Sequence, residues 1–297
     1  MTDPQAPSRA SAASADPDLD QSDGGHGALA HLWRLQQGRP RRSLVGRLFG
    51  TDPLLPDARR WFAGVEGELE VARLLSTLGN GWRTIHTVPI GDDADVDHVV
   101  IGPGGVFTVT TKSHVAGNVW VGERAVLVDG YRQPYLPTAR FQAERVSELL
   151  GRASARHVAV EAVVVVANAK KLTVASMPRG VTVVTAAQLV AWLRRRPATL
   201  DIDCVRHITR AALQRSTWRP SAQLARAMGV TVPHDDVTKE ARAETADPAE
   251  LRAWWQHLRG EVATARRVRT AWSLLVPVGA VLGALAVPPA IHALTPL

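Results

Sequence analysis

The stretch VAVEAVVVVAN, residues 158–168, is almost continuously apolar and rich in β-branched valine. A run of this length suits a single strand, because β-branched side chains pack well on a pleated surface. A strand that is apolar on both sides is typical of a sheet covered on both of its faces. The run therefore predicts a sheet whose two faces are both covered.

The segments around this run supply the other parts of such a domain. Short segments rich in Val, Ile and Thr precede it and are separated by Gly, Pro and Asp, which is the pattern of strands and turns: WRTIHTVPI, VDHVVIG, GVFTVTTK, NVWVG and AVLVDG. Helices are expected in WFAGVEGELEVARLLSTLG, over residues 138–150, and in AAQLVAWLRR. Residues 58–196 are therefore predicted to form an α/β domain with a central mixed sheet flanked by helices.

The rest of the chain divides by composition. The N-terminal part has too few large apolar side chains to offset chain entropy, and the segment after it is basic and interrupted by proline. The expected parts are a disordered tail (1–32), a basic linker (33–57), a helical extension (197–231), a second linker (232–247), a basic helix (248–269) and a transmembrane helix (270–292).

The charge of the chain limits its partners. The 297 residues include 35 Lys and Arg against 28 Asp and Glu, a formal net charge of +7. This excess suits nucleic acid or an anionic membrane face, and a solvated basic surface is the plain alternative. A single cysteine, Cys204, excludes an internal disulfide framework and a cysteine-based zinc site.

The C-terminal stretch from Thr270 to Ile291 has no charged side chain. About 20 apolar residues are enough for a helix to cross the hydrocarbon layer. Arginines precede the stretch, at Arg266, Arg267 and Arg269, and by the positive-inside rule they would keep the N-terminal part in the cytoplasm. We therefore expect a protein of the cell membrane, single-pass near its C-terminus. The alternative is a hairpin buried against the domain.

Asp93 to Lys112 contains the residues best suited to catalysis. Two strands joined by a Gly-Pro-Gly-Gly turn would place Asp97 across from Thr110 and Lys112, because alternate side chains share one face of a strand. A carboxylate is a ligand for Mg²⁺, and a lysine can orient water or neutralise charge as a phosphodiester reacts. The pattern favours a metal-dependent phosphodiesterase site.

Four separated motifs resemble one known family: GVEGELEVARLL, DVDHVVIGPGGVFTVTTK, HVAGNVWV and PTARFQAERVSELL. In this order they are similar to the nuclease-related domain (NERD) family, whose core is like that of the PD-(D/E)XK nucleases, a restriction-endonuclease-like fold. The resemblance covers about residues 64–150. It implies a site of Glu68, Asp97, an acid in the next strand, Lys112 and Gln142, with Asp97 and Glu68 as metal ligands for Mg²⁺.

The chain departs from that family pattern at one position. The family's Glu-x-Lys is Thr110-Thr111-Lys112 here, so the second carboxylate is absent, and a neutral hydroxyl is a far weaker Mg²⁺ ligand. Glu68 also has a second interpretation, as an acid favoured by the helix dipole. The sequence thus predicts a membrane-anchored protein that engages nucleic acid, and leaves open whether it also hydrolyses phosphodiesters with Mg²⁺. The alternative is a catalytically inactive binding or scaffolding module at the membrane.

Overall fold

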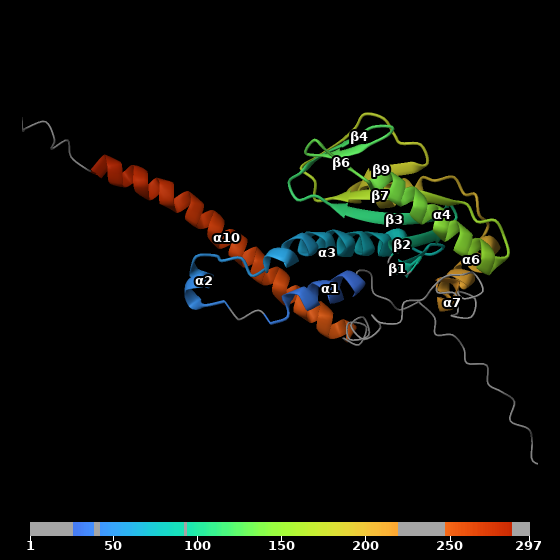
Figure 1. Ribbon diagram of the computed structural model, residues 1–297, viewed down its shortest axis with the longest axis horizontal. Helices are drawn as coiled ribbons and strands as arrows, with labels where there is room; N and C mark the ends of the chain where they lie inside the picture. The colour runs from blue at the N-terminus through green and yellow to red at the C-terminus, as the bar shows by residue number, and fades with distance from the viewer. Residues whose placement is uncertain (1–25, 39–41, 92–93, 219–246, 287–297) are drawn as a thin grey trace, which may run out of the picture. The chain divides into compact units, whose positions relative to one another are not determined.

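A computed structural model describes residues 26–38, 42–91, 94–218 and 247–286. These residues fall into two compact units: one includes the described residues from Glu66 to Trp218, and the other those from His26 to Val65 and from 247 to 286. The elements, labelled in Figure 1, are α1 (His26–Gln36), α2 (Leu44–Leu48), α3 (Pro56–Leu75), β1 (Arg83–Pro89), β2 (Asp95–Gly102), β3 (Gly105–Ser113), β4 (Asn118–Val121), β5 (Val126–Val128), β6 (Tyr131–Gln133), α4 (Tyr135–Ser154), β7 (Val160–Ala167), β8 (Lys171–Val174), β9 (Val181–Thr185), α5 (Ala186–Arg194), α6 (Ile202–Leu213), α7 (Arg215–Trp218) and α10 (Pro248–Ala286).

The first unit is built on a five-stranded mixed sheet in the order β1-β2-β3-β7-β9. The first three strands are antiparallel, and β3, β7 and β9 run parallel to one another. β2 and β3 form a tight hairpin, with Gly102 opposite Gly105, so the Gly-Pro-Gly-Gly segment is a turn. The mixed α/β fold expected from the sequence is confirmed.

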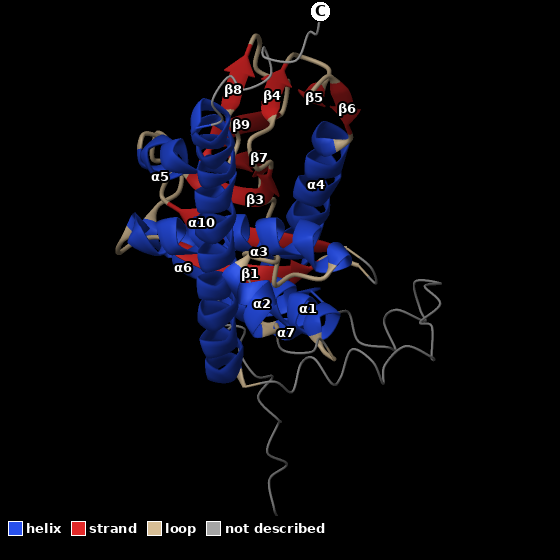
Figure 2. Ribbon diagram, turned by 90° about the vertical axis from the view of Figure 1, so that its left-hand side faces the viewer, coloured by secondary structure: helices blue, strands red, loops and turns tan. Residues whose placement is uncertain are grey.

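The valine run is β7, and its residues alternate between two apolar clusters. Val163 and Val165 pack with Val71 of α3 and Leu189 of α5, whereas Val164 and Val166 pack with a cluster that includes Leu136 of α4. Figure 2 shows α5 and α4 on opposite sides of the strands. Helices on both faces explain why every second residue of β7 does not have to be polar.

A second, smaller sheet adjoins the first in the same unit. Its four strands lie in the order β6-β5-β4-β8, with β4 and β8 parallel. Val119 and Val121 of β4 and Val126 of β5 are buried in the cluster shared with α4, β7 and β9. The inner face of this sheet therefore packs on the core, and its other face points outward, at the upper end of the unit in Figure 1.

The second unit is helical. Leu251, Trp255, Leu258 and Val262 of α10 are buried at spacings of three and four residues, the period of one helix face. Phe62 of α3 packs on Trp255, with 4.8 Å between the ring centroids. Buried residues of α1 include Ala30, which lies in a cluster with Leu251.

The helices α1 and α2 correct part of the domain organisation expected from the sequence. They lie within segments 1–32 and 33–57, which were expected to be a tail and a linker. Leu29 and Leu32 of α1 are buried, so this short helix is stabilised by packing that its own composition does not reveal. Residues 1–25, and the linker predicted over 232–247 up to residue 246, lie outside the described residues.

The predicted transmembrane helix over 270–292 is not supported. α10 is one helix from Pro248, and its described part stops at Ala286, before the predicted end of the span. Trp272 lies against α2: its indole N–H donates to the Leu48 carbonyl over 2.8 Å, and its ring stacks on Phe49. Within the described ranges, no helix is long and apolar enough to cross a membrane. Residues 287–292 of the prediction lie outside those ranges.

Candidate functional site

The β2–β3 hairpin places Asp97 beside the end of β3. The two strands pair up to His98 opposite Val109, and the next residue on each strand is Asp97 and Thr110. A carboxylate oxygen of Asp97 accepts a hydrogen bond from the backbone N–H of Thr111 over 2.5 Å. Lys112, two residues beyond Thr110, lies close enough to lower the pKa of Asp97.

Glu68 lies near Asp97 and Lys112 because α3 approaches the sheet very closely. We call these three residues the Glu68–Asp97–Lys112 corner. A Cβ at Gly67 would lie 3.2 Å from the Cβ atoms of Ala167 and Ser113, at the ends of β7 and β3. A Cβ at this distance would press on both strand ends, so glycine favours this close approach of α3. The next residue, Glu68, is then near enough to Asp97 and Lys112 for their charges to shift its pKa.

The electrostatics of the corner are those of two crowded, half-buried carboxyl groups. Burial, and secondly the charge of Asp97, raise the pKa of Glu68 to about 8, although Lys112 acts in the opposite direction. Burial also raises the pKa of Asp97, whereas Lys112 and the Thr111 N–H lower it. Two like charges in a low dielectric repel, so one proton is retained near neutral pH unless a cation replaces it.

Thr110 stands where the family pattern has an acid, and its hydroxyl is already engaged. The buried hydroxyl donates to the amide oxygen of Gln142 over 2.8 Å. The amide nitrogen of Gln142 donates to the backbone carbonyl of Asp95, also over 2.8 Å. Gln142 therefore links α4 to β2 and β3, and both ends of its amide are occupied within the domain.

The residues present fit a single Mg²⁺ ion better than a metal pair. Among the residues that the structure describes, no three His, Cys, Asp or Glu side chains form a group that could hold a metal ion. Mg²⁺ often takes only one or two carboxylates and completes its shell with water and substrate phosphate oxygens. Asp97 and Glu68 meet that smaller requirement, and Thr110 adds no charge.

Lys112 also contacts an aromatic residue at the edge of the corner. Its ammonium group lies 5.6 Å from the centroid of the Tyr135 ring, at the start of α4, within the range of a cation–π contact. The Tyr135 hydroxyl in turn is 3.0 Å from Nε2 of His114. These contacts hold Lys112 at the edge of the site.

The histidines of the hairpin form a pair that the sequence did not indicate. His98 of β2 is on the strand face opposite Asp97, and it lies across from His86 of β1. The two Nδ1 atoms are 2.9 Å apart. His98 is fully buried, and its Nε2 has no hydrogen-bond partner among the described residues. Only the strand register reveals this pair.

The mixed sheet flanked by helices defines the class of the fold as α/β, and two carboxylates and a lysine gather at one corner of it. The comparison with protein families narrows this further. Residues 63–167, from within α3 to the end of β7, match the family model of the nuclease-related domain (NERD). No curated protein and no solved structure matched the chain.

The raised pKa of Glu68 predicts a stability that depends on pH. Above the usual pKa of 4.5, the folded protein retains a proton on Glu68 that the unfolded chain releases. The stability that this proton contributes is therefore full below pH 4.5 and is lost as the pH rises to about 8. Glu68→Gln removes this loss. In urea unfolding without divalent metal, we expect it to raise the free energy of unfolding at pH 8.5 by roughly 1–3 kcal/mol and to change it little at pH 4.5.

The matched control for this experiment is Glu144→Gln, at an exposed carboxylate of α4. A loss of stability between pH 4.5 and 8.5 that is the same in Glu68→Gln as in the wild-type protein would contradict the assignment of this proton to Glu68.

Proposed function

We propose that the nuclease-related domain engages nucleic acid at the Glu68–Asp97–Lys112 corner as a binding module with little or no phosphodiester hydrolysis. One observation supports this most strongly. The side chain of Thr110, at the position of the missing acid, is neutral and buried and donates its hydroxyl hydrogen to Gln142, so it brings no negative charge to a metal ion.

The remaining groups are suited to holding a phosphate. Lys112 offers a positive charge at the edge of the corner, where its Tyr135 contact positions it. A Mg²⁺ ion held by Asp97 and Glu68 would supply further positive charge toward a phosphate oxygen. The net charge of +7 adds a general attraction for a polyanion.

The second candidate function is slow Mg²⁺-dependent hydrolysis of phosphodiesters. It is favoured by the presence of both Asp97 and Lys112, which lie close enough for the charge of Lys112 to lower the pKa of Asp97. In that case Asp97 and Glu68 hold the metal, and Lys112 orients the attacking water or stabilises the charge of the transition state. The two candidates share a site and differ only in whether a product is formed.

The location at the cell membrane, with the N-terminal domain in the cytoplasm, depended on the predicted span and stays a prediction. Fractionation of cells that express the full chain, beside a chain lacking residues 270–297, tests it. Equal membrane recovery of the two chains would contradict it.

The proposed function is tested by binding and cleavage measured together. Wild-type protein is mixed with labelled single- and double-stranded DNA and RNA, with Mg²⁺ or Mn²⁺, over a range of salt. Binding through phosphates must weaken steeply as salt rises. Lys112→Gln should reduce the slope of log affinity against log salt by about one. Arg206→Gln, in α6, is the control and should leave the slope unchanged.

Two results separate the outcomes. Cleavage that disappears in Asp97→Asn would establish the hydrolytic candidate, and binding without cleavage would support the module. Affinity that does not change with salt, or no binding at all, would overturn both.

A further inference from the structure

The outer face of the small sheet presents a row of side chains across its four strands. Cross-strand partners share one face, and Trp120 of β4 lies opposite Leu127 of β5 and Thr173 of β8, while Leu127 lies opposite Arg132 of β6. The neighbours of Trp120 along β4, Val119 and Val121, point inward and are buried. Trp120 is 41% exposed, near the middle of this outer face.

The indole of Trp120 lies against the backbone of Gly122. A Cβ at Gly122 would overlap Cη2 of Trp120 and would lie 2.7 Å from Cζ3. The space above Gly122 is therefore filled by the six-membered ring of the indole. Gly122 follows directly after β4, so the ring packs on the backbone just beyond the end of its own strand.

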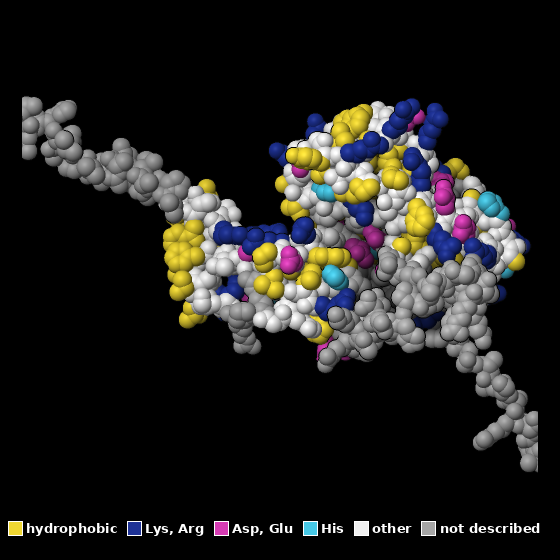
Figure 3. Space-filling view, in the orientation of Figure 1, with side chains coloured by type: hydrophobic (Ala, Val, Ile, Leu, Met, Phe, Trp, Pro, Cys, Tyr) yellow, Lys and Arg dark blue, Asp and Glu magenta, His cyan; other side chains and the backbone are white. Residues whose placement is uncertain are grey.

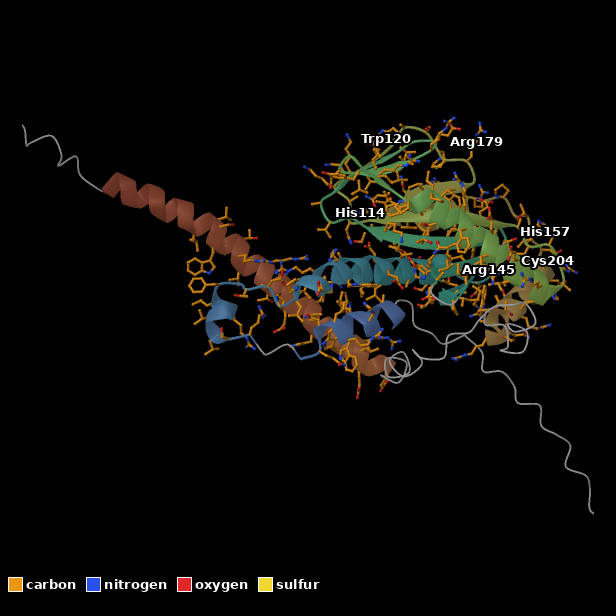
Figure 4. All side chains as sticks on the ribbon, viewed as in Figure 1. His114, Trp120, Arg145, His157, Arg179 and Cys204 are labelled. Carbon is orange, nitrogen blue, oxygen red and sulfur yellow. The ribbon has the colours of Figure 1, made fainter. Side chains whose placement is uncertain are left out.

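The surroundings of this ring are basic. Residues 115–133 and 168–180, which carry β4 to β6 and β8, contain five basic side chains, Arg124, Arg132, Lys170, Lys171 and Arg179, and two acidic ones, Glu123 and Asp129. Both acids have partners: Glu123 lies 3.2 Å from Arg179, and Asp129 accepts from the N–H of Asn118. Figure 3 shows Lys and Arg beside hydrophobic side chains at this end, and Figure 4 labels Trp120 and Arg179 there.

We propose that the outer face of the β6-β5-β4-β8 sheet, which we call the Trp120 platform, binds single-stranded nucleic acid by stacking a base on Trp120 and holding its phosphates with Arg132 and Lys171. The inference rests on the proposed engagement of nucleic acid. It adds a second contact surface to the same domain, next to the Glu68–Asp97–Lys112 corner.

The spacing of these side chains and their chemistry favour an unpaired strand of nucleic acid. Neighbouring strands are about 4.8 Å apart, so Arg132, two strands from Trp120, lies about 10 Å away across the sheet. Lys171 is on β8, next to β4 on the other side, opposite Asn118. Bases stack on aromatic rings through faces that a duplex covers, and basic groups track the backbone on either side. The polypeptide chain also connects the Trp120 platform with the Glu68–Asp97–Lys112 corner, because β3 ends one residue beyond Lys112 and β4 is the next strand.

The experiment measures the affinity of the full chain for labelled single-stranded and duplex DNA of the same sequence by fluorescence anisotropy. EDTA is present, so hydrolysis cannot contribute. We expect Trp120→Ala to weaken binding of the single strand about tenfold and binding of the duplex far less. Trp120→Phe should retain most of the affinity. Gly122→Ala, which displaces the indole without removing it, should weaken binding as well.

Two further variants separate stacking from general surface effects. Phe141→Ala removes an exposed aromatic ring from α4, where 56% of Phe141 is accessible, and should leave affinity unchanged. Lys171→Gln should lower the salt slope by about one without changing the preference for a single strand.

The outcomes distinguish this inference from the proposed function. Salt-dependent binding by the wild-type protein with no loss in Trp120→Ala would overturn the Trp120 platform and leave the proposed function standing. An equal loss for single strand and duplex would overturn the stacking of an unpaired base. If the wild-type protein binds no oligonucleotide, both the Trp120 platform and the proposed function fail.

Discussion

Thr110→Glu is expected to cleave labelled nucleic acid with Mg²⁺ at least roughly 100-fold faster than the wild-type protein, because one well-placed electrostatic group typically changes a rate by that factor or more. Position 110 follows directly from the register that sets Asp97 beside β3, on the strand face of Lys112. A glutamate there would add the acid that the Glu-x-Lys pattern requires. It would also break the bond from Thr110 to Gln142.

The control for this gain is Thr110→Gln, which has the size of glutamate but neither its charge nor its affinity for Mg²⁺. Thermal unfolding with and without Mg²⁺ shows whether each variant is folded, and a folded Thr110→Glu should be stabilised by the ion. The new activity must disappear in the double variant that also carries Asp97→Asn. If Thr110→Glu is folded and stabilised by Mg²⁺ but does not cleave, the corner is not a nuclease site that lacks only one acid.

Acid should destabilise the protein through the His86–His98 pair. Burial lowers the pKa of His98 well below its usual value of 6.5, with His86 as a further cause, and burial also lowers the pKa of His86. As the pH falls below 6.5, the folded state binds fewer protons than the unfolded chain. The stability that the pair contributes is therefore full above pH 6.5 and decreases as the pH falls. We expect the contribution of this pair to the free energy of unfolding, taken as the difference between the wild-type protein and a variant without the pair, to drop by roughly 2–3 kcal/mol between pH 6.5 and 5, at about 1.4 kcal/mol per pH unit for one group. The Glu68 proton acts in the opposite direction over this range, and the difference removes it because both chains carry it.

The double variant His86→Leu/His98→Leu should lose this pH dependence. Replacing both partners of a buried hydrogen bond by apolar side chains is often nearly neutral, so the variant is expected to fold. Unfolding in urea at pH 8, where both histidines are neutral, isolates the packing effect of the change from the effect of protonation. A wild-type slope below pH 6.5 that persists in the double variant would show that other groups cause it.

The layered α/β domain could be predicted from the sequence because its signals are local. Apart from Glu161, every residue of β7 is apolar, and the Gly-Pro-Gly-Gly segment is typical of a turn between two strands. The family resemblance also depends on motifs that are short and contiguous, and the match over residues 63–167 bears it out. The missing acid at position 110 was equally visible, since it concerns the identity of one residue.

The C-terminal stretch shows where local signals were insufficient. Hydropathy predicted a membrane span, yet Trp272, within that stretch, is placed by Leu48 and Phe49, more than two hundred residues earlier in the chain. Likewise, α1 is held by contacts with α10 that its own composition does not disclose. The composition of a segment therefore does not show which distant segment packs against it.

The sequence by itself determined the fold class, the strand carrying Asp97, the lysine after it and the absence of the second carboxylate. Only the tertiary structure decided the contacts of the side chains. These are the hydrogen bond from Thr110 to Gln142, the surroundings that raise the pKa of Glu68, the His86–His98 pair and the packing of Trp120 on Gly122. The reason is physical. Residue type and strand alternation act over a few neighbours along the chain, whereas burial, register and helix approach depend on segments that meet only after folding.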